Sequence, residues 1–164
     1  IKKKKQRNAR IISFILFMIL LLSTAGYALL YQSDKSQQTP NSALYQMNYN
    51  GQTLKFNYRP EEVREISVDG NFNFASYAGK PLYVVSDNGA VNAEIASTLG
   101  MFVSKIQRAC LGACEDDLPE KDCSENLIIW KDSPEKKVYQ QQNCVFINGD
   151  LQAVDAFLFK VFGF

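Results

Sequence analysis

The sequence predicts a domain of the α+β class behind a single N-terminal transmembrane helix. Three observations lead to this fold class: a long charge-free apolar stretch near the amino terminus, several short apolar segments typical of β-strands, and two longer segments with apolar residues at three- and four-residue spacing. Taken in order, the segments after the apolar stretch predict a β-hairpin followed by a βαββα unit. We therefore expect a mixed sheet with helices packed on it.

The charge-free stretch covers residues 11–31 and reads IISFILFMILLLSTAGYALLY. A helix of this length just spans the roughly 30 Å hydrocarbon core of a bilayer. Tyr27 and Tyr31 lie where an interfacial aromatic belt is expected. The stretch is therefore predicted to be a transmembrane helix that acts as a signal anchor.

The formal charge of the chain is divided between two regions. The chain has 18 Lys and Arg residues and 17 Asp and Glu residues, but residues 1–10 contain six of the bases and no acid. The remaining residues carry a net charge of −5. Because basic flanks of a membrane helix stay in the cytoplasm, this basic arm predicts a cytoplasmic amino terminus and an extracytoplasmic carboxyl-terminal domain. The six bases are Lys2, Lys3, Lys4, Lys5, Arg7 and Arg10.

A cleaved secretory signal is the alternative to an uncleaved anchor. The most apolar part, residues 11–22, has the length of a signal-peptide core, and Gly26 and Ala28 are small residues that fit a cleavage site. Both interpretations place the domain outside the cytoplasm. The polar residues 32–42 lack apolar periodicity and predict a flexible tether, so we expect the folded domain at residues 43–164.

The first element of this domain is a β-hairpin centred on Asn50-Gly51. These two residues supply the positive φ angles that a two-residue type I′ turn needs. Counting outward from the turn pairs Met47 with Leu54 and Tyr45 with Phe56. The turn and the apolar pattern demand the same register, because all four side chains then lie on one face.

The middle of the domain predicts a short helix, a loop, a strand and a long helix. Residues 60–63 begin with proline and carry two acids, as a first helical turn does, whereas residues 69–80 predict a loop. Residues 81–85 are apolar and β-branched and predict a buried strand. A helix is expected over residues 90–110. Its apolar stripe would consist of Val91, Ile95, Leu99, Phe102, Val103 and Ile106.

The last third of the domain predicts further strands and a closing helix. Residues 127–130 are expected to pair in parallel with the preceding strand, since a strand, a crossover helix and a second strand usually form a right-handed parallel unit. Residues 138–141 and 144–147 are expected to extend the sheet as an antiparallel meander. Asp150 then caps the final helix. Its apolar stripe contains Leu151, Val154, Phe157, Leu158 and Val161.

The four cysteines Cys110, Cys114, Cys123 and Cys144 all lie in the domain. An even number of cysteines outside the cytoplasm predicts two disulfides. Three pairings are possible. The expected helix would place Cys110 and Cys114 on one face, so we expect each to pair with a different downstream cysteine in preference to a bridge between the two. A zinc site or a redox site is the alternative. A zinc site would need two C-x2-C motifs, which the cysteine spacing does not provide. A redox site would need a cysteine of lowered pKa, whereas the carboxyl end of a helix raises the pKa of a thiol. We therefore predict no metal site and no cofactor.

Asp87 and Asn88 form the strongest candidate ligand site. They lie at the carboxyl end of a predicted strand and at the start of a predicted helix, where open α/β sheets bind anionic ligands. An ordinary helix cap requires the same residue types and is the favoured interpretation. The sequence contains no histidine, which excludes His-dependent catalysis and metal binding, and the acidic domain argues against nucleic acid as a partner.

The part of the chain from Cys110 to Phe164 resembles small signal-anchored archaeal membrane proteins of unassigned function. The residues that carry the resemblance are CSENLIIWKDSPEKKVYQQQNCVFINGD and the ending DAFLFKVFGF. The layout is also similar, with a basic start, one membrane helix, a hairpin and four late cysteines. The resemblance implies a membrane location and disulfides, and it implies no catalytic residues.

These patterns predict a structural or protein-interaction subunit of a membrane or cell-surface assembly. The expected partners are the lipid bilayer and other membrane or surface proteins. A membrane-tethered thiol–disulfide oxidoreductase that uses Cys110 and Cys114 is the alternative from a different class. No other residue is predicted to be catalytic.

Overall fold

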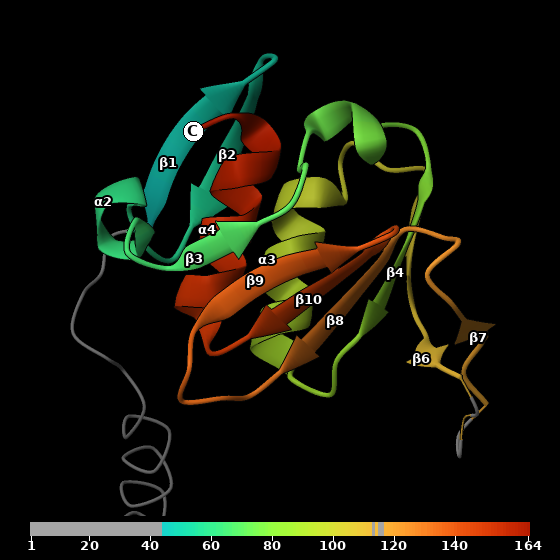
Figure 1. Cartoon of the computed structure of the whole chain (residues 1–164). Helices are drawn as coiled ribbons and strands as arrows, with labels where there is room; N and C mark the ends of the chain where they lie inside the picture. The colour runs from blue at the N-terminus through green and yellow to red at the C-terminus, as the bar shows by residue number, and fades with distance from the viewer. Residues whose placement is uncertain (1–43, 113, 115–116) are drawn as a thin grey trace, which may run out of the picture. The chain divides into compact units, whose positions relative to one another are not determined.

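The computed structural model describes residues 44–112, 114 and 117–164. The predicted basic arm, transmembrane helix and tether, residues 1–42, lie outside the described residues. In the described part of the chain, no helix is long and apolar enough to cross a membrane. This part is a mixed α+β domain with a mixed sheet, as the sequence predicts (Figure 1).

The main sheet has six strands in the order β3-β9-β10-β8-β4-β5. Strands β9 and β10 are antiparallel, and every other neighbouring pair is parallel. The four strands predicted at 81–85, 127–130, 138–141 and 144–147 are confirmed, and β3 and β5 are additions. The strands are β3 (Ser67–Asp69), β9 (Lys137–Gln141), β10 (Cys144–Asn148), β8 (Leu127–Lys131), β4 (Pro81–Val85) and β5 (Lys105–Arg108).

Two helices cover one face of this sheet. Helix α4 (Leu151–Phe162) packs against α3 (Gly89–Leu99) and against strands β9 and β10, and Figure 1 shows both helices behind the sheet. The short helix α2 (Pro60–Val63) is confirmed where predicted and packs on α4. The predicted loop at 69–80 contains a single 3-10 turn, Phe74–Ser76.

The hairpin forms with the predicted turn and register. Strands β1 (Tyr45–Tyr49) and β2 (Gln52–Phe56) pair Met47 with Leu54 and Tyr45 with Phe56. Asn50 and Gly51 have φ angles of 49° and 79°, which a type I′ turn requires. The apolar face of the hairpin packs on the helices, and the polar face is exposed.

Aromatic rings fill the space between the hairpin and helix α4. The Phe56 ring centroid lies 4.5 Å from that of Phe159, and the Tyr49 centroid lies 4.9 Å from that of Phe162. Phe56 is fully buried. Burial of these rings holds the hairpin on the helices, because large aromatic side chains contribute the most apolar area per residue.

The predicted helix over 90–110 is wrong in its second half. Helix α3 ends at Leu99, the chain turns after Gly100, and residues 105–108 form strand β5 parallel to β4. Phe102, Val103 and Ile106 continue the helical spacing, yet they reach the core from a turn and a strand. The apolar spacing of residues 102–106 is too short to distinguish a helix from a strand. Residues 105–108 form a strand because they pair with the edge of β4.

The predicted antiparallel meander is also wrong in its order. Strand β10 lies between β9 and β8 and is parallel to β8, so β8 and β9 are not neighbours. Strand β10 reads CVFIN and has apolar residues on both faces, as a central strand needs, whereas β9 reads KVYQQ and is half polar. The more apolar strand therefore occupies the central position.

Candidate functional site

Two disulfides are present, as predicted, but their pairing differs from the expectation. Cys110 pairs with Cys114 and Cys123 pairs with Cys144, with Cα–Cα distances of 5.9 and 4.8 Å. The expected pairing assumed that Cys110 ends a helix. It lies instead in the short strand β6 (Cys110–Leu111), and a turn at Gly112, with a φ of 76°, brings Cys114 back to it.

Asp87 and Asn88 lie at the start of helix α3, where the side chain of Asn88 caps the helix. Its Oδ1 accepts hydrogen bonds from the backbone N–H groups of Ala90 and Val91, at 2.9 and 3.2 Å. The Asn88 N–H in turn donates to the Ser86 hydroxyl at 3.1 Å. The amide oxygen of Asn88 is therefore used by the helix, whereas Asp87 is exposed to solvent.

A buried pair of carboxyl groups, Glu94 and Asp155, was not predicted. Glu94 projects from α3 and Asp155 from α4, and their side chains meet beneath the end of the hairpin. The Asn57 side-chain amide donates to Glu94 Oε2 at 2.6 Å, and the Tyr58 backbone N–H donates to Asp155 Oδ2 at 2.8 Å. Asp155 lies in the apolar stripe of its helix between Val154 and Leu158, and a charged residue in such a stripe is the signal that could have revealed the pair.

Burial of the two neighbouring carboxyl groups favours a proton on the pair. Burial, followed by the nearby charge of Glu94, raises the pKa of Asp155 to about 8. Burial also raises the pKa of Glu94. Oε1 of Glu94 and Oδ1 of Asp155 have no hydrogen-bond partner among the described residues. A proton between the two groups satisfies oxygens that would otherwise carry the cost of burial.

The carboxyl pair is enclosed by the protein. The exposed fraction is 0% for Asp155 and 7% for Glu94, so a dissolved substrate cannot reach either group. Both are hydrogen-bonded to residues that connect β2 to α2. The pair therefore fixes the hairpin and α2 to the two main helices.

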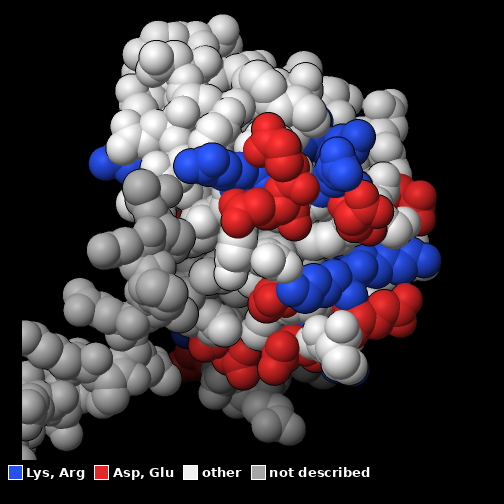
Figure 2. All heavy atoms as spheres, turned by 90° about the vertical axis from the view of Figure 1, so that its left-hand side faces the viewer, with Lys and Arg blue, Asp and Glu red and all other residues white. Residues whose placement is uncertain are grey.

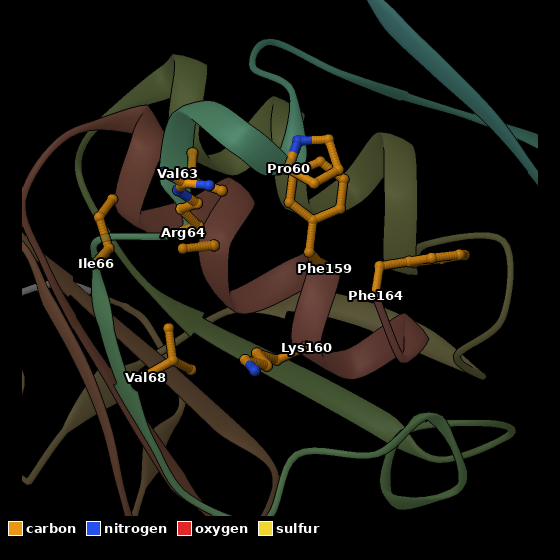
Figure 3. A pocket seen from close by; sticks show the side chains of 9 residues that line it. Pro60, Val63, Arg64, Ile66, Val68, Phe159, Lys160 and Phe164 are labelled. Carbon is orange, nitrogen blue, oxygen red and sulfur yellow. The ribbon is translucent and has the colours of Figure 1, made fainter.

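An apolar pocket of about 220 Å³ lies between α2, α4 and the segment that leads into β3 (Figure 3). Among the described residues, Arg64 and Lys160 are the charged ones that line it. The Arg64 side chain is 74% exposed and pairs with Glu65 at 3.2 Å. Figure 2 shows acidic and basic side chains intermixed on the left-hand side of the domain as drawn in Figure 1. The pocket walls are formed by Pro60, Val63, Ile66, Val68, Ala156, Phe159 and Phe164.

The sheet face opposite the helices carries a continuous line of apolar side chains. Val85, Ile129, Phe146 and Tyr139 are register partners on four neighbouring strands, and we call them the apolar row. All four are partly exposed. The Tyr139 and Phe146 rings stack with centroids 4.9 Å apart and planes 9° apart. No helix of the described part lies over this row.

A further part of the chain covers the first residues of β4, β8 and β10 on the same face of the sheet. Residues 109–112 and 117–125, which we call the raised segment, include β6 and β7 (Glu120–Lys121). Lys121 places its Nζ 4.3 Å from the Tyr83 ring centroid, and Cys123 is tied to Cys144. This cover reduces the exposed fraction of Tyr83 to 6%.

On the other side of the apolar row lie Lys131, Asn148 and Lys137, which we call the lysine row. They are register partners on β8, β10 and β9. In the part of the chain that the structure describes, neither lysine forms an ion pair. The face therefore has one covered side, an apolar middle and an open side with two lysines, and the exposed Asp69 of β3 lies beside Tyr139 at its edge.

No family, curated protein or solved structure matches this chain. The resemblance to signal-anchored archaeal proteins stays a prediction. Within the described ranges, no group of three or more Cys, Asp or Glu residues is arranged to hold a metal ion.

Proposed function

We propose that the chain is a single-pass membrane-anchored protein whose extracytoplasmic, disulfide-stabilised domain makes protein contacts in a membrane or cell-surface assembly. The apolar row is the observation that supports a contact function. Four partly exposed apolar side chains in one line, on a sheet face that no helix of the described part covers, are typical of a surface that another protein covers. The basic arm and the charge-free stretch support the membrane anchor.

Site-specific photo-crosslinking tests the contact function. A photoreactive amino acid at Ile129 of the full chain, in intact cells, is expected to give a crosslinked product of higher mass. The same amino acid at Gln46, on the exposed polar face of the hairpin, serves as the matched control. A product at neither position, or at both in equal amounts, would contradict a contact surface at the apolar row.

Fractionation and protease protection test the anchor. An uncleaved anchor keeps the whole chain in the membrane fraction, and protease added outside the cell digests the carboxyl-terminal domain. Release of a shortened soluble domain supports the alternative of a cleaved signal. Protection of the domain in sealed cells would overturn the predicted orientation.

The alternative function, thiol–disulfide exchange, is favoured by the bridge between Cys110 and Cys114. Both cysteines of this bridge are partly exposed, whereas Cys144 of the other bridge is fully buried. A mild dithiol that reduces only the exposed bridge, with the fluorescence of the single tryptophan Trp130 unchanged, would support this alternative. Loss of the fold on reduction supports purely structural disulfides.

A further inference from the structure

The hairpin of β1 and β2 is joined to the rest of the domain by very few hydrogen bonds. Its strands pair with each other and take no part in the six-stranded sheet (Figure 1). In the described part of the chain, every hydrogen bond from residues 44–58 to the rest of the domain ends on Glu94 or Asp155. The donors are Asn57 and Tyr58, which lie where the hairpin continues into α2. The carboxyl pair is therefore the polar attachment of the hairpin, and packing of apolar side chains supplies the rest.

The carboxyl pair has no base to balance its charge. Both side chains are buried, and neither forms an ion pair among the described residues. Glu94 is the only charged residue of α3, and the one other charged residue of α4, Lys160, is exposed. The charged side chains of the hairpin, its connection and α2 are also exposed. They are Lys55, Arg59, Glu61 and Glu62. A proton is therefore what reduces the charge of the buried pair.

Tyr58 is the other titratable residue beside the pair, and it does not supply a charge. Burial raises the pKa of its phenol, so Tyr58 is neutral where the carboxyl groups titrate. Asp150, Lys136 and Glu62 also act on this phenol. Asp150 and Lys136 form an ion pair with each other at 2.8 Å, and Glu62 accepts a hydrogen bond from the Arg59 N–H at 2.7 Å. The proton equilibrium at this place therefore belongs to the carboxyl pair.

From this arrangement we infer that the carboxyl pair is a pH-controlled latch, which holds the hairpin on α3 and α4 while the pair keeps a proton and releases it when the proton leaves. Two carboxylates buried side by side without a base repel each other, and each carries the cost of burial. Loss of the proton therefore favours a state in which both groups reach water. Departure of the hairpin is sufficient for this state, because the six-stranded sheet contains neither of its strands.

Release of the hairpin exposes an aromatic surface that the docked hairpin covers. Leu54 and Phe56 are fully buried, and the centroid of the Phe56 ring lies 4.5 Å from that of Phe159. Burial of this apolar area favours the docked hairpin again once the pH falls. The latch thus controls access to an apolar surface on the helix side of the sheet. It goes beyond the proposed contact function and does not depend on it, because the apolar row lies on the opposite face.

The direction of the switch follows from the proton that the docked state keeps. The pKa of Asp155 is about 8 in the docked state, whereas a carboxyl group that reaches water returns to its ordinary pKa of 3.8. Docking is therefore strongest below the ordinary pKa and weakens as the pH rises toward 8. One released proton changes the docking equilibrium about tenfold per pH unit, or about a hundredfold between pH 5 and pH 7.

Hydrogen–deuterium exchange of the full chain in mild detergent, corrected for the intrinsic exchange rate at each pH, tests the latch. An isolated two-stranded hairpin is marginally stable, so the amides of β1 and β2 exchange once the hairpin is released. We expect their protection to be lower than that of the β10 amides and to fall about a hundredfold from pH 5 to pH 7. Equal protection of the hairpin and β10 at every pH would overturn the latch, since the hairpin would then open only with the whole domain.

Amide variants show whether the carboxyl pair controls the release. The double variant Glu94→Gln/Asp155→Asn has no titrating group at the latch, so the protection of its hairpin should stay nearly constant between pH 5 and pH 7. Asp155→Asn alone keeps Glu94 and should show a smaller fall than the wild type. Asp132→Asn, on the exposed turn after β8, is the matched control and should follow the wild type. A hundredfold fall in the double variant would overturn the latch. So would a wild-type hairpin whose protection does not change with pH, whether or not the variants fold.

Discussion

Replacement of Asp155 by asparagine removes the titration of Asp155 from the buried carboxyl pair and leaves that of Glu94. The asparagine carbonyl can accept the bond from the Tyr58 N–H, and its amide can donate to Glu94 where the Asp155 proton did. The shape of the side chain is nearly the same. The substitution therefore isolates the effect of the proton on the free energy of unfolding.

The sign of the effect follows from the two pKa values of Asp155. Burial raises the pKa from 3.8 to about 8, so the native protein keeps a proton that the unfolded chain releases above its ordinary pKa. The stabilisation is complete below the unfolded pKa and is lost as the pH rises toward 8. One group changes the free energy of unfolding by about 1.4 kcal/mol per pH unit, or about 3 kcal/mol between pH 5 and pH 7. Glu94, with its pKa also raised, acts in the same direction.

Urea unfolding of the full chain in detergent, followed by the fluorescence of Trp130, measures this change. We expect the wild type to lose stability from pH 5 to pH 7 and Asp155→Asn to lose about 3 kcal/mol less over the same range. Asp132→Asn, on the exposed turn after β8, is the control and should follow the wild type. Parallel pH profiles for wild type and Asp155→Asn would refute the shared proton.

Four further variants test the fold by the same unfolding measurement. Phe56→Ala should destabilise the domain by about 3 to 5 kcal/mol, because the buried ring is lost at the hairpin–helix contact, whereas exposed Lys55→Ala should have little effect. A disulfide that closes a longer loop restricts the unfolded chain more and stabilises the fold more. Alanine at both Cys123 and Cys144, which are 21 residues apart, should therefore cost about 3 kcal/mol, and alanine at both Cys110 and Cys114, which are 4 residues apart, about 2 kcal/mol. The reverse order would contradict this dependence on loop length. Asn88→Ala should cost about 1 kcal/mol through the lost helix cap, and an unchanged midpoint would show that the cap is dispensable.

Features that depend on a few neighbouring residues were predicted well. The hairpin register follows from the turn at Asn50-Gly51 and from the alternation beside it. The start of α4 follows from Asp150, which caps the helix through its side chain. The even count of cysteines predicted the two disulfides, but their pairing could not be predicted, because a β-strand in place of the expected helix end changes which cysteines meet.

The sequence by itself determined the hairpin, the starts of α3 and α4, the mixed α+β class and the presence of two disulfides, because turns, caps and apolar spacing act over a few residues. The tertiary structure alone decided the end of α3 at Leu99 and the central position of β10. It alone also formed the carboxyl pair. The hydrogen bonds of Glu94 and Asp155 reach residues that lie 37 and 97 positions away in the sequence. The same holds for the apolar row, whose members come from four strands. Such contacts depend on which distant surfaces are buried together, and no pattern within one segment contains that information.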